Sequence, residues 1–295
     1  MRLSHRVLAP ALFLSVLTFA HAQESASGLP KGYFSGDPLP PATIYLTFDD
    51  GPAPETAQIL DVLKDKGVKA TFFLNAFDRH LPAREIAKSN RFIEYKDVLE
   101  RMVAEGHVLG NHTFSHRDLA TLTTDQINWQ LDMVQKCLDD ALGVDSPRLT
   151  LMRPPFGSPW LGRWATPEQR SKVAAVMTAR GLTVINWTNA WDSSDSIDWV
   201  NGESQRLTKA DFVPTADYTN KQNRELHRLL AHADGQTSAV ILFHDTHPTS
   251  LDILAEVIDK YKALGYTFAT MDQYSQWRWK DQTPVSPTPD AAPRP

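Results

Sequence analysis

Residues 44–74 read IYLTFDDGPAPETAQILDVLKDKGVKATFFL and contain two apolar runs separated by an amphipathic segment. The run Ile44–Phe48 predicts a buried strand, and Ala70–Leu74 predicts a second one. Between them, Glu55–Lys66 carries apolar residues at helical spacing, and Gly67 favours the end of a helix directly afterwards. The stretch therefore predicts a strand, a helix and a second strand in succession.

The same alternation continues to the end of the chain. Further strands are predicted at His107–Leu109, Leu149–Met152, Thr183–Asn186, Ala239–Phe243 and Tyr266–Ala269, and further helices at Thr124–Leu142, Pro167–Arg180 and Thr249–Leu264. Repeated strand–helix alternation favours a parallel sheet, so the fold class is α/β. About seven strands in this length indicate a closed or nearly closed (β/α) barrel. Functional residues should then follow the strands, because chemistry gathers at their carboxyl ends.

Composition excludes several classes of protein. The chain has 295 residues, a net charge of −5 and an ordinary share of hydrophobic residues, 42%. Lys and Arg are not clustered as they are in nucleic-acid-binding proteins, so a nucleic-acid partner is not expected. The only cysteine, Cys137, excludes an internal disulfide and a cysteine-rich zinc site. Any metal must therefore be held by histidines and carboxylates.

The N-terminus resembles an export signal. Basic residues precede the apolar stretch Val7–Ala20, and Ala20-His21-Ala22 gives a cleavage site, so residues 1–22 are predicted to be a signal peptide cleaved after Ala22. The alternative, an uncleaved membrane anchor, needs a longer run of roughly 20 residues. The mature protein is then periplasmic or secreted, with no membrane contact after cleavage. Residues 23–40 are predicted to be a linker, residues 41–280 one folded domain, and residues 281–295 a disordered proline-rich tail.

Two motifs offer metal ligands. TFDDGP, residues 47–52, places Asp49 and Asp50 directly after a predicted strand, where one carboxylate can bind a cation and the other can handle a proton. In HTFSH, residues 112–116, His112 and His116 are four residues apart and can meet one ion. With Asp50 they form a His₂–carboxylate set that leaves positions open for water and substrate. Taken alone, each motif is better explained as an ordinary turn or loop.

Three further motifs also follow predicted strands. In RPPFG, residues 153–157, Arg153 can pair with a carboxylate, and Gly157 lets the backbone approach a ligand closely. DSIDW, residues 195–199, is the weakest signal and reads equally well as a polar loop with a packing tryptophan. In LFHD, residues 242–245, His244 lies at the mouth of a buried strand, where it can act as a proton donor.

These five motifs, in this order, are similar to those of the polysaccharide deacetylase family, also called carbohydrate esterase family four or the NodB-homology class. The flanking segments KATFF (69–73) and GHVLGN (106–111) also resemble this family, and the similarity covers residues 42–272. It implies a distorted (β/α) barrel of the NodB-homology type over residues 41–280. It also implies one divalent metal, zinc in the first place, with Co²⁺, Mn²⁺ or Ni²⁺ as substitutes.

The resemblance also implies a role for each matching residue. Asp49 is the general base; Asp50, His112 and His116 hold the metal; Arg153 pairs with Asp49; His244 is the general acid with Asp198 as its partner; the N–H of Phe156 helps to hold the oxyanion; and Leu242 and Trp199 line the acetyl pocket. A near-repeat that begins at Asp192 leaves Asp195 as the alternative partner of His244. Trp160 is a candidate for stacking on a sugar, although most tryptophans pack in cores.

The implied activity is hydrolysis of N-acetyl groups on polysaccharides that contain N-acetylglucosamine: peptidoglycan, chitin-like polymers or exopolysaccharides. An O-acetyl esterase acting on acetylxylan would use the same site, and a catalytically inactive carbohydrate-binding protein is a further alternative. A metallophosphatase is disfavoured because such sites prefer two metals. The sequence does not determine which polymer is the substrate or what the oligomeric state is. It also leaves open the roles of two long connections, residues 75–97 and residues 187–223, the second of which contains the insertion 200–223.

Overall fold

The computed structural model describes residues 28–34, 36, 38–77, 89–161, 164–197 and 199–278. The predicted signal peptide and proline-rich tail lie outside these residues. The strands are β1 (Gly32–Phe34), β2 (Thr43–Asp49), β3 (Thr71–Leu74), β4 (Val108–Asn111), β5 (Leu151–Met152), β6 (Thr183–Ile185), β7 (Ala239–His244) and β8 (Thr267–Phe268). The helices are α2 (Thr56–Asp65), α4 (Lys96–Ala104), α5 (Thr124–Leu142), α6 (Pro167–Ala179), α7 (Glu203–Thr208), α8 (Ala216–Leu230), α9 (Pro248–Ala263) and α10 (Met271–Arg278).

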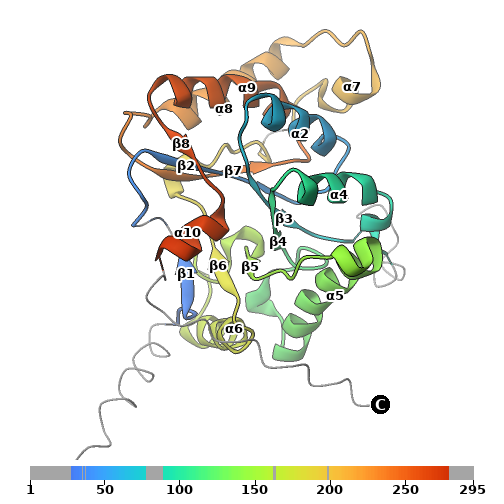
Figure 1. Ribbon diagram of the computed structural model, residues 1–295, viewed down its shortest axis with the longest axis vertical. Coiled ribbons are helices and arrows are strands. Elements are labelled where there is room, and N and C mark those ends of the chain that lie inside the picture. Colours follow the sequence, from blue (N-terminus) through green and yellow to red (C-terminus); the bar gives the residue numbers. More distant parts are fainter. Residues whose placement is uncertain are drawn as a thin grey trace, which may run out of the picture.

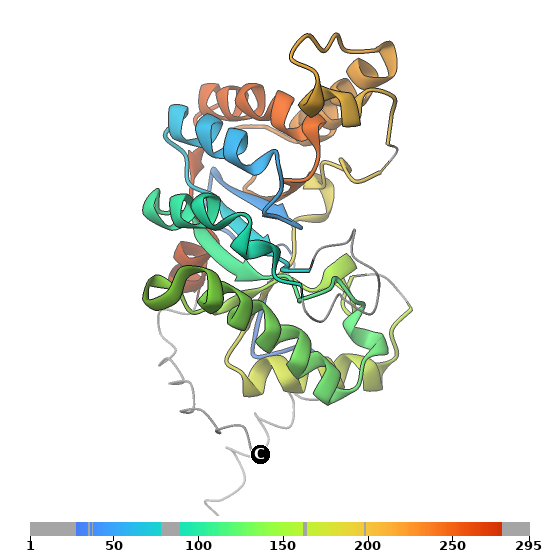
Figure 2. The same cartoon turned by 90° about the vertical axis from the view of Figure 1, so that its right-hand side faces the viewer.

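All strands pair in parallel in one curled sheet, in the order β1-β6-β5-β4-β3-β2-β7, and β8 pairs with the start of β2. Figures 1 and 2 show the sheet surrounded by helices, with α2, α4 and α5 stacked one below another along one side. Beyond β7, residues 188–193 continue the curl, because Thr188 N–H donates to Val240 O and Ser193 N–H donates to Leu242 O. This confirms the predicted distorted (β/α) barrel.

Side-chain alternation along β2 divides the core into an outer and an inner part. Ile44, Leu46 and Phe48 pack outward against the covering helices, whereas Tyr45 belongs to an inner cluster. Helix α10 contributes Tyr274 to that inner cluster, with its ring edge-on to that of Tyr45 at 6.0 Å between centroids. The buried face of each element thus follows the two-residue period of a strand.

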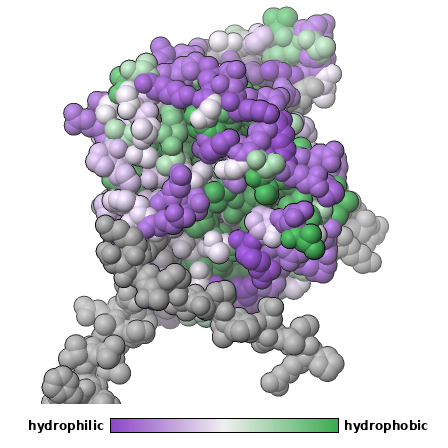
Figure 3. Space-filling view, viewed as in Figure 1, coloured by the Kyte–Doolittle hydropathy of each residue, from purple (hydrophilic) through white to green (hydrophobic). Residues whose placement is uncertain are grey.

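Helix starts agree with the local sequence. Thr123 caps α5 and Thr166 caps α6, each in a reciprocal capping box with the glutamine three residues later. In Figure 3, which has the same view as Figure 1, hydrophilic residues cover much of the surface over the outer helices, as expected for amphipathic helices. Among the described residues, each helix is too short or too polar to cross a membrane.

The predicted linker was partly wrong. Within residues 23–40, Gly32–Phe34 forms β1, which pairs with β6 at the edge of the sheet. Phe34 is buried in the inner cluster, where its ring lies edge-on to Tyr274 at 4.9 Å between centroids. The folded domain therefore begins before residue 41. Glycine and proline on both sides of this three-residue strand concealed it.

Candidate active site

The loop after β2 is shaped by close packing against the end of β7. Asp50 adopts a left-handed backbone conformation, with φ 75°. At Gly51 a Cβ atom would lie 2.0 Å from Oδ2 of Asp245, so this position accepts only glycine. Asp245 is fully buried and accepts a hydrogen bond from Thr56 Oγ1 at 2.6 Å. This packing fixes the turn that follows Asp49 and aims the two neighbouring carboxylates.

Three predicted metal ligands come together at this turn. One ligand atom from each of Asp50, His112 and His116 lies within 4.8 Å of the other two. Oδ1 of Asp50 is 3.6 Å from Nε2 of His112 and 3.4 Å from Nε2 of His116. This spacing suits three ligands around one ion, and the donor set is that of a catalytic zinc site with open positions.

The protonation states of the two histidines fit this role. Nδ1 of His112 lies 2.7 Å from the carbonyl oxygen of Arg153, so it donates there and leaves Nε2 free for a metal. Burial, and then the neighbouring His112, lowers the pKa of His116 to about 4. His116 is therefore neutral at pH 7 and offers a lone pair, as metal binding requires.

Two residues behind the site were not identified from the sequence. Asn75 follows β3, and its Nδ2 donates to Oδ1 of Asp50 at 2.9 Å. Arg91 donates to Oδ1 of Asn75 at 2.8 Å and also to the main-chain carbonyl of Asp50. Both lie in the long connection 75–97, which thus supports the backbone and the carboxylate of a metal ligand.

Asp49 and Arg153 form a buried ion pair. Asp49 is 3% exposed and Arg153 is fully buried, and Nη1 of Arg153 lies 2.8 Å from Oδ1 of Asp49. The guanidinium also donates to Thr47 Oγ1 at 2.8 Å and to the carbonyl of Ile185 at 3.0 Å. Oδ2 of Asp49 is 3.7 Å from Nε2 of His112. One carboxylate oxygen is thus held by arginine, and the other lies beside the metal ligands.

His244, at the end of β7, is held by Asp195. Its Nδ1 lies 2.7 Å from Oδ1 of Asp195, and its main-chain N–H donates to Oδ2 at 2.7 Å. Burial disfavours the imidazolium, but the Asp195 carboxylate outweighs burial and raises the pKa of His244 to about 10. Of the two partners that the sequence left open, Asp195 makes this contact, and the preferred one, Asp198, lies outside the described residues. Ser194, directly before Asp195, has φ 58°.

The remaining predicted residues occupy different surroundings. Phe156 is exposed, with φ 60°, and its ring lies 4.7 Å from that of His116. A Cβ atom on Gly157, at φ 65°, would lie 2.7 Å from the side chain of Leu161. Leu242 is buried in β7. The RPPFG loop therefore borders the metal ligands.

The two tryptophans differ. Trp199 is 62% exposed, and its ring lies 4.8 Å from that of His247, which in turn lies 5.8 Å from that of His244. Trp160 donates from Nε1 to the carbonyl of Gly28 at 2.6 Å, and its ring packs 5.3 Å from that of Tyr33. Trp160 thus has packing contacts of its own, whereas the ring of Trp199 is open to solvent beside the catalytic candidates.

Comparison with known proteins identifies this constellation. Residues 36–195 match the model of the polysaccharide deacetylase family. The chain belongs to the polysaccharide deacetylase family. It is similar to a chitin deacetylase of Pestalotiopsis sp., with 34% identity over 90% of this chain and 75% of the relative. It is also similar to a peptidoglycan-N-acetylglucosamine deacetylase of Bacillus cereus, with 30% identity over 82% of this chain and 71% of the relative.

A solved structure supports the fold. The chitin deacetylase of the fungal pathogen Colletotrichum lindemuthianum superposes with a TM-score of 0.60, covering 82% of this chain and 90% of that chain. Because the two sequences are only 22% identical, this similarity concerns the fold alone. As a member of this family, the chain is a polysaccharide deacetylase.

Proposed function

We propose that this deacetylase removes N-acetyl groups from N-acetylglucosamine-containing polysaccharide outside the cytoplasm, with one divalent cation held by Asp50, His112 and His116. The observation that carries the proposal is the meeting of this triad with the Asp49–Arg153 pair at the mouth of the barrel. A cation there would lower the pKa of water and polarise the acetyl carbonyl. Zinc suits the donor set best.

Asp49 is the general base in this mechanism. It accepts a proton from the water molecule whose oxygen attacks the acetyl carbonyl carbon. Arg153 is paired with Asp49 at 2.8 Å and fixes the position of its carboxylate. The N–H of Phe156 assists by holding the developing oxyanion, an interaction worth roughly 3–4 kcal/mol for one good donor.

His244 is the general acid. When the carbon–nitrogen bond breaks, it gives a proton to the departing amine, and acetate and a free amino sugar result. Asp195 stabilises the imidazolium form at 2.7 Å, so His244 is charged before the reaction begins. Leu242 and the exposed Trp199 supply the apolar lining for the acetyl methyl group.

Acetate release from a panel of polymers tests this function. N-acetylglucosamine oligomers, peptidoglycan and acetylxylan are incubated with the protein, and Asp49→Asn serves as the blank. We expect acetate from at least one N-acetylated polymer and none above the blank with Asp49→Asn. Acetate from acetylxylan alone would replace the proposal with the O-acetyl esterase. No acetate from any polymer would favour an inactive carbohydrate-binding protein.

A further inference from the structure

The main chain of Asp195 is held from two sides, and its N–H donates to Ser193 Oγ at 3.4 Å within its own segment. Residues 193–197 form a turn in which Ile197 N–H donates to Ser194 O at 3.1 Å. The carboxylate is fixed at its far end, where Ser250 Oγ and the main-chain N–H of His244 donate to Oδ2 at 2.6 and 2.7 Å. These bonds hold the side chain, whereas the carbonyl oxygen of Asp195 is bound by a residue from another element.

Lys221, on α8, contacts that main chain. Its side chain is 2% exposed, and Nζ donates to the carbonyl oxygen of Asp195 at 2.6 Å. The same Nζ donates to Oε1 of Glu203, on α7, at 2.7 Å. Glu203 and Lys221 both lie in the long connection 187–223, and α8 continues beyond it to Leu230. A buried ammonium is tolerated only when it is paired and hydrogen-bonded, and here both conditions are met.

The charges around this ammonium are balanced. Glu225 lies one helical turn after Lys221, with Oε1 3.7 Å from Nζ, and it accepts a hydrogen bond from Thr249 Oγ1 at 2.9 Å. Burial raises the pKa of Glu225 to about 8, so at pH 7 this carboxyl is mostly neutral. Burial also opposes the ionisation of Glu203, but His247 and then Lys221 outweigh it and lower the pKa of Glu203. Lys221 thus faces one ionised carboxylate.

The helices that carry this pair are fixed to the element after His244. Asp252, on α9, accepts hydrogen bonds from Arg206 of α7 at 2.8 Å, from the Tyr218 hydroxyl of α8 at 2.8 Å and from Gln222 of α8 at 3.1 Å. Helix α9 begins at Pro248, four residues after His244. Lys221 is therefore held in a fixed position relative to the strand end that bears the general acid.

We propose that Lys221 is a positioning residue for His244, acting through the main-chain carbonyl of Asp195, and that the connection 187–223 exists in part to supply it. This inference rests on the proposed function, because it takes His244 to be the acid. Without Lys221, the main-chain carbonyl of Asp195 would lose this hydrogen bond, and the position of the Asp195 carboxylate would be less fixed. His244 would then spend less time aligned toward the leaving amine.

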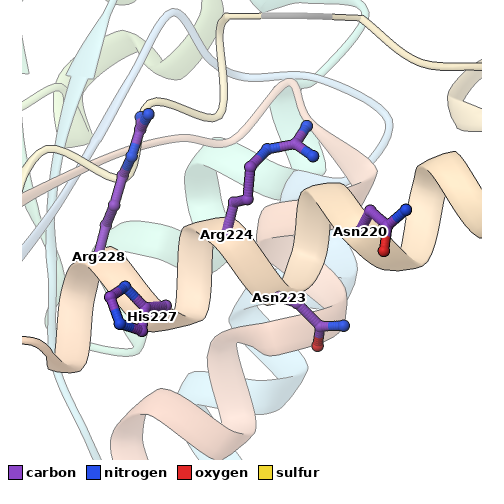
Figure 4. A pocket seen from close by; sticks show the side chains of 5 residues that line it. All are labelled: Asn220, Asn223, Arg224, His227 and Arg228. Atoms are coloured by element: carbon purple, nitrogen blue, oxygen red, sulfur yellow. The ribbon is translucent and has the colours of Figure 1, made fainter.

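The same helix offers a matched control. Arg224 lies three residues after Lys221 but on the exposed face, where it lines a surface pocket of about 370 Å³ with Asn220, Asn223, His227 and Arg228 (Figure 4). Arg224→Met removes one positive charge from α8, as Lys221→Met does, without touching Asp195.

The experiment compares two leaving groups. Each variant is assayed on an N-acetylglucosamine oligomer, whose amine must be protonated to leave, and on 4-nitrophenyl acetate, whose phenolate departs without a proton. The ratio of the two kcat/KM values is independent of the fraction of folded protein. General acids contribute about 10²–10⁴-fold, so a misplaced acid in Lys221→Met should lower the amide-to-ester ratio by ~10-fold or more. Arg224→Met should leave the ratio unchanged.

A second variant guards against misfolding. Lys221→Met removes the ammonium that donates to the buried Glu203 carboxylate at 2.7 Å. Lys221→Met/Glu203→Gln is therefore measured beside it, because glutamine keeps the shape without the charge. A fallen ratio in both variants supports the inference. A fallen ratio in His244→Ala with an unchanged ratio in both Lys221 variants would overturn the inference alone. An unchanged ratio in His244→Ala would overturn the acid assignment and the inference with it.

Discussion

Replacing Arg153 by methionine should destabilise the fold as well as abolish activity. The guanidinium is fully buried and pairs with the buried Asp49 at 2.8 Å. It also lies over the ring of Phe73, with 4.4 Å from Cζ to the centroid. Methionine would keep part of the packing but leave the Asp49 carboxylate without its counter-charge in the core of the barrel.

The magnitude follows from this burial. Breaking a buried ion pair by removing one partner costs about 3–5 kcal/mol, because the remaining charge is uncompensated. For a domain of this size, one kcal/mol shifts the melting temperature by about 2–4 °C, so the expected fall is roughly 6–20 °C. Arg153→Met/Asp49→Asn should recover part of this loss, because neither position then carries an unpaired buried charge.

Denaturant unfolding followed by circular dichroism measures these differences. Arg148→Met is the matched control: its guanidinium is 3.6 Å from Asp139 but its side chain is 72% exposed, so we expect a change of about 1 kcal/mol or less. If Arg153→Met is as stable as Arg148→Met, the buried pair does not contribute the stability assigned to it. A double variant no more stable than Arg153→Met alone would show that the unpaired Asp49 charge is not the cause of the loss.

Three further predictions concern the rest of the site. A general acid is active below its pKa and loses activity as the pH rises through that pKa. Asp195→Asn removes the carboxylate that raises the pKa of His244, so the alkaline limb of the pH–rate profile should move to lower pH. An unmoved alkaline limb would contradict the assignment of His244 as the acid. Gly51→Ala should cost about 1–3 kcal/mol in unfolding free energy and most of the activity, because its Cβ would meet Asp245 Oδ2 at 2.0 Å; normal stability would disprove this clash. Asn75→Ala should weaken zinc binding about 10–100-fold in a competitive titration, and unchanged affinity would deny Asn75 a supporting role.

Much of the barrel was predictable because its elements carry regular patterns. The strand–helix–strand unit at residues 44–74 and the capped helix Thr124–Leu142 were found where their apolar spacing placed them. Helix α8 was not predicted, and two of its four buried residues are the charged Lys221 and Glu225. A helix whose buried face is charged looks like a solvated segment in the sequence.

The metal ligands could be predicted as a set because each lies directly after a strand. The partner of His244 could not, because Asp192, Asp195 and Asp198 are evenly spaced in the sequence, and the contact of Asp195 with Nδ1 of His244 joins residues 49 positions apart. Asn75 and Arg91 were missed for a related reason. Their hydrogen bonds to Asp50 join residues 25 and 41 positions apart, and no local motif announces them.

Metal-dependent deacetylation is tested most directly by acetate release from N-acetylglucosamine oligomers by the chelator-treated protein during titration with Zn²⁺. His116→Ala runs in parallel, since it lacks one ligand of the triad. We predict no acetate without metal, a rise that saturates near one zinc per chain, and little recovery in the variant. Full acetate release by the exhaustively chelated protein, or equal recovery in His116→Ala, would contradict the account.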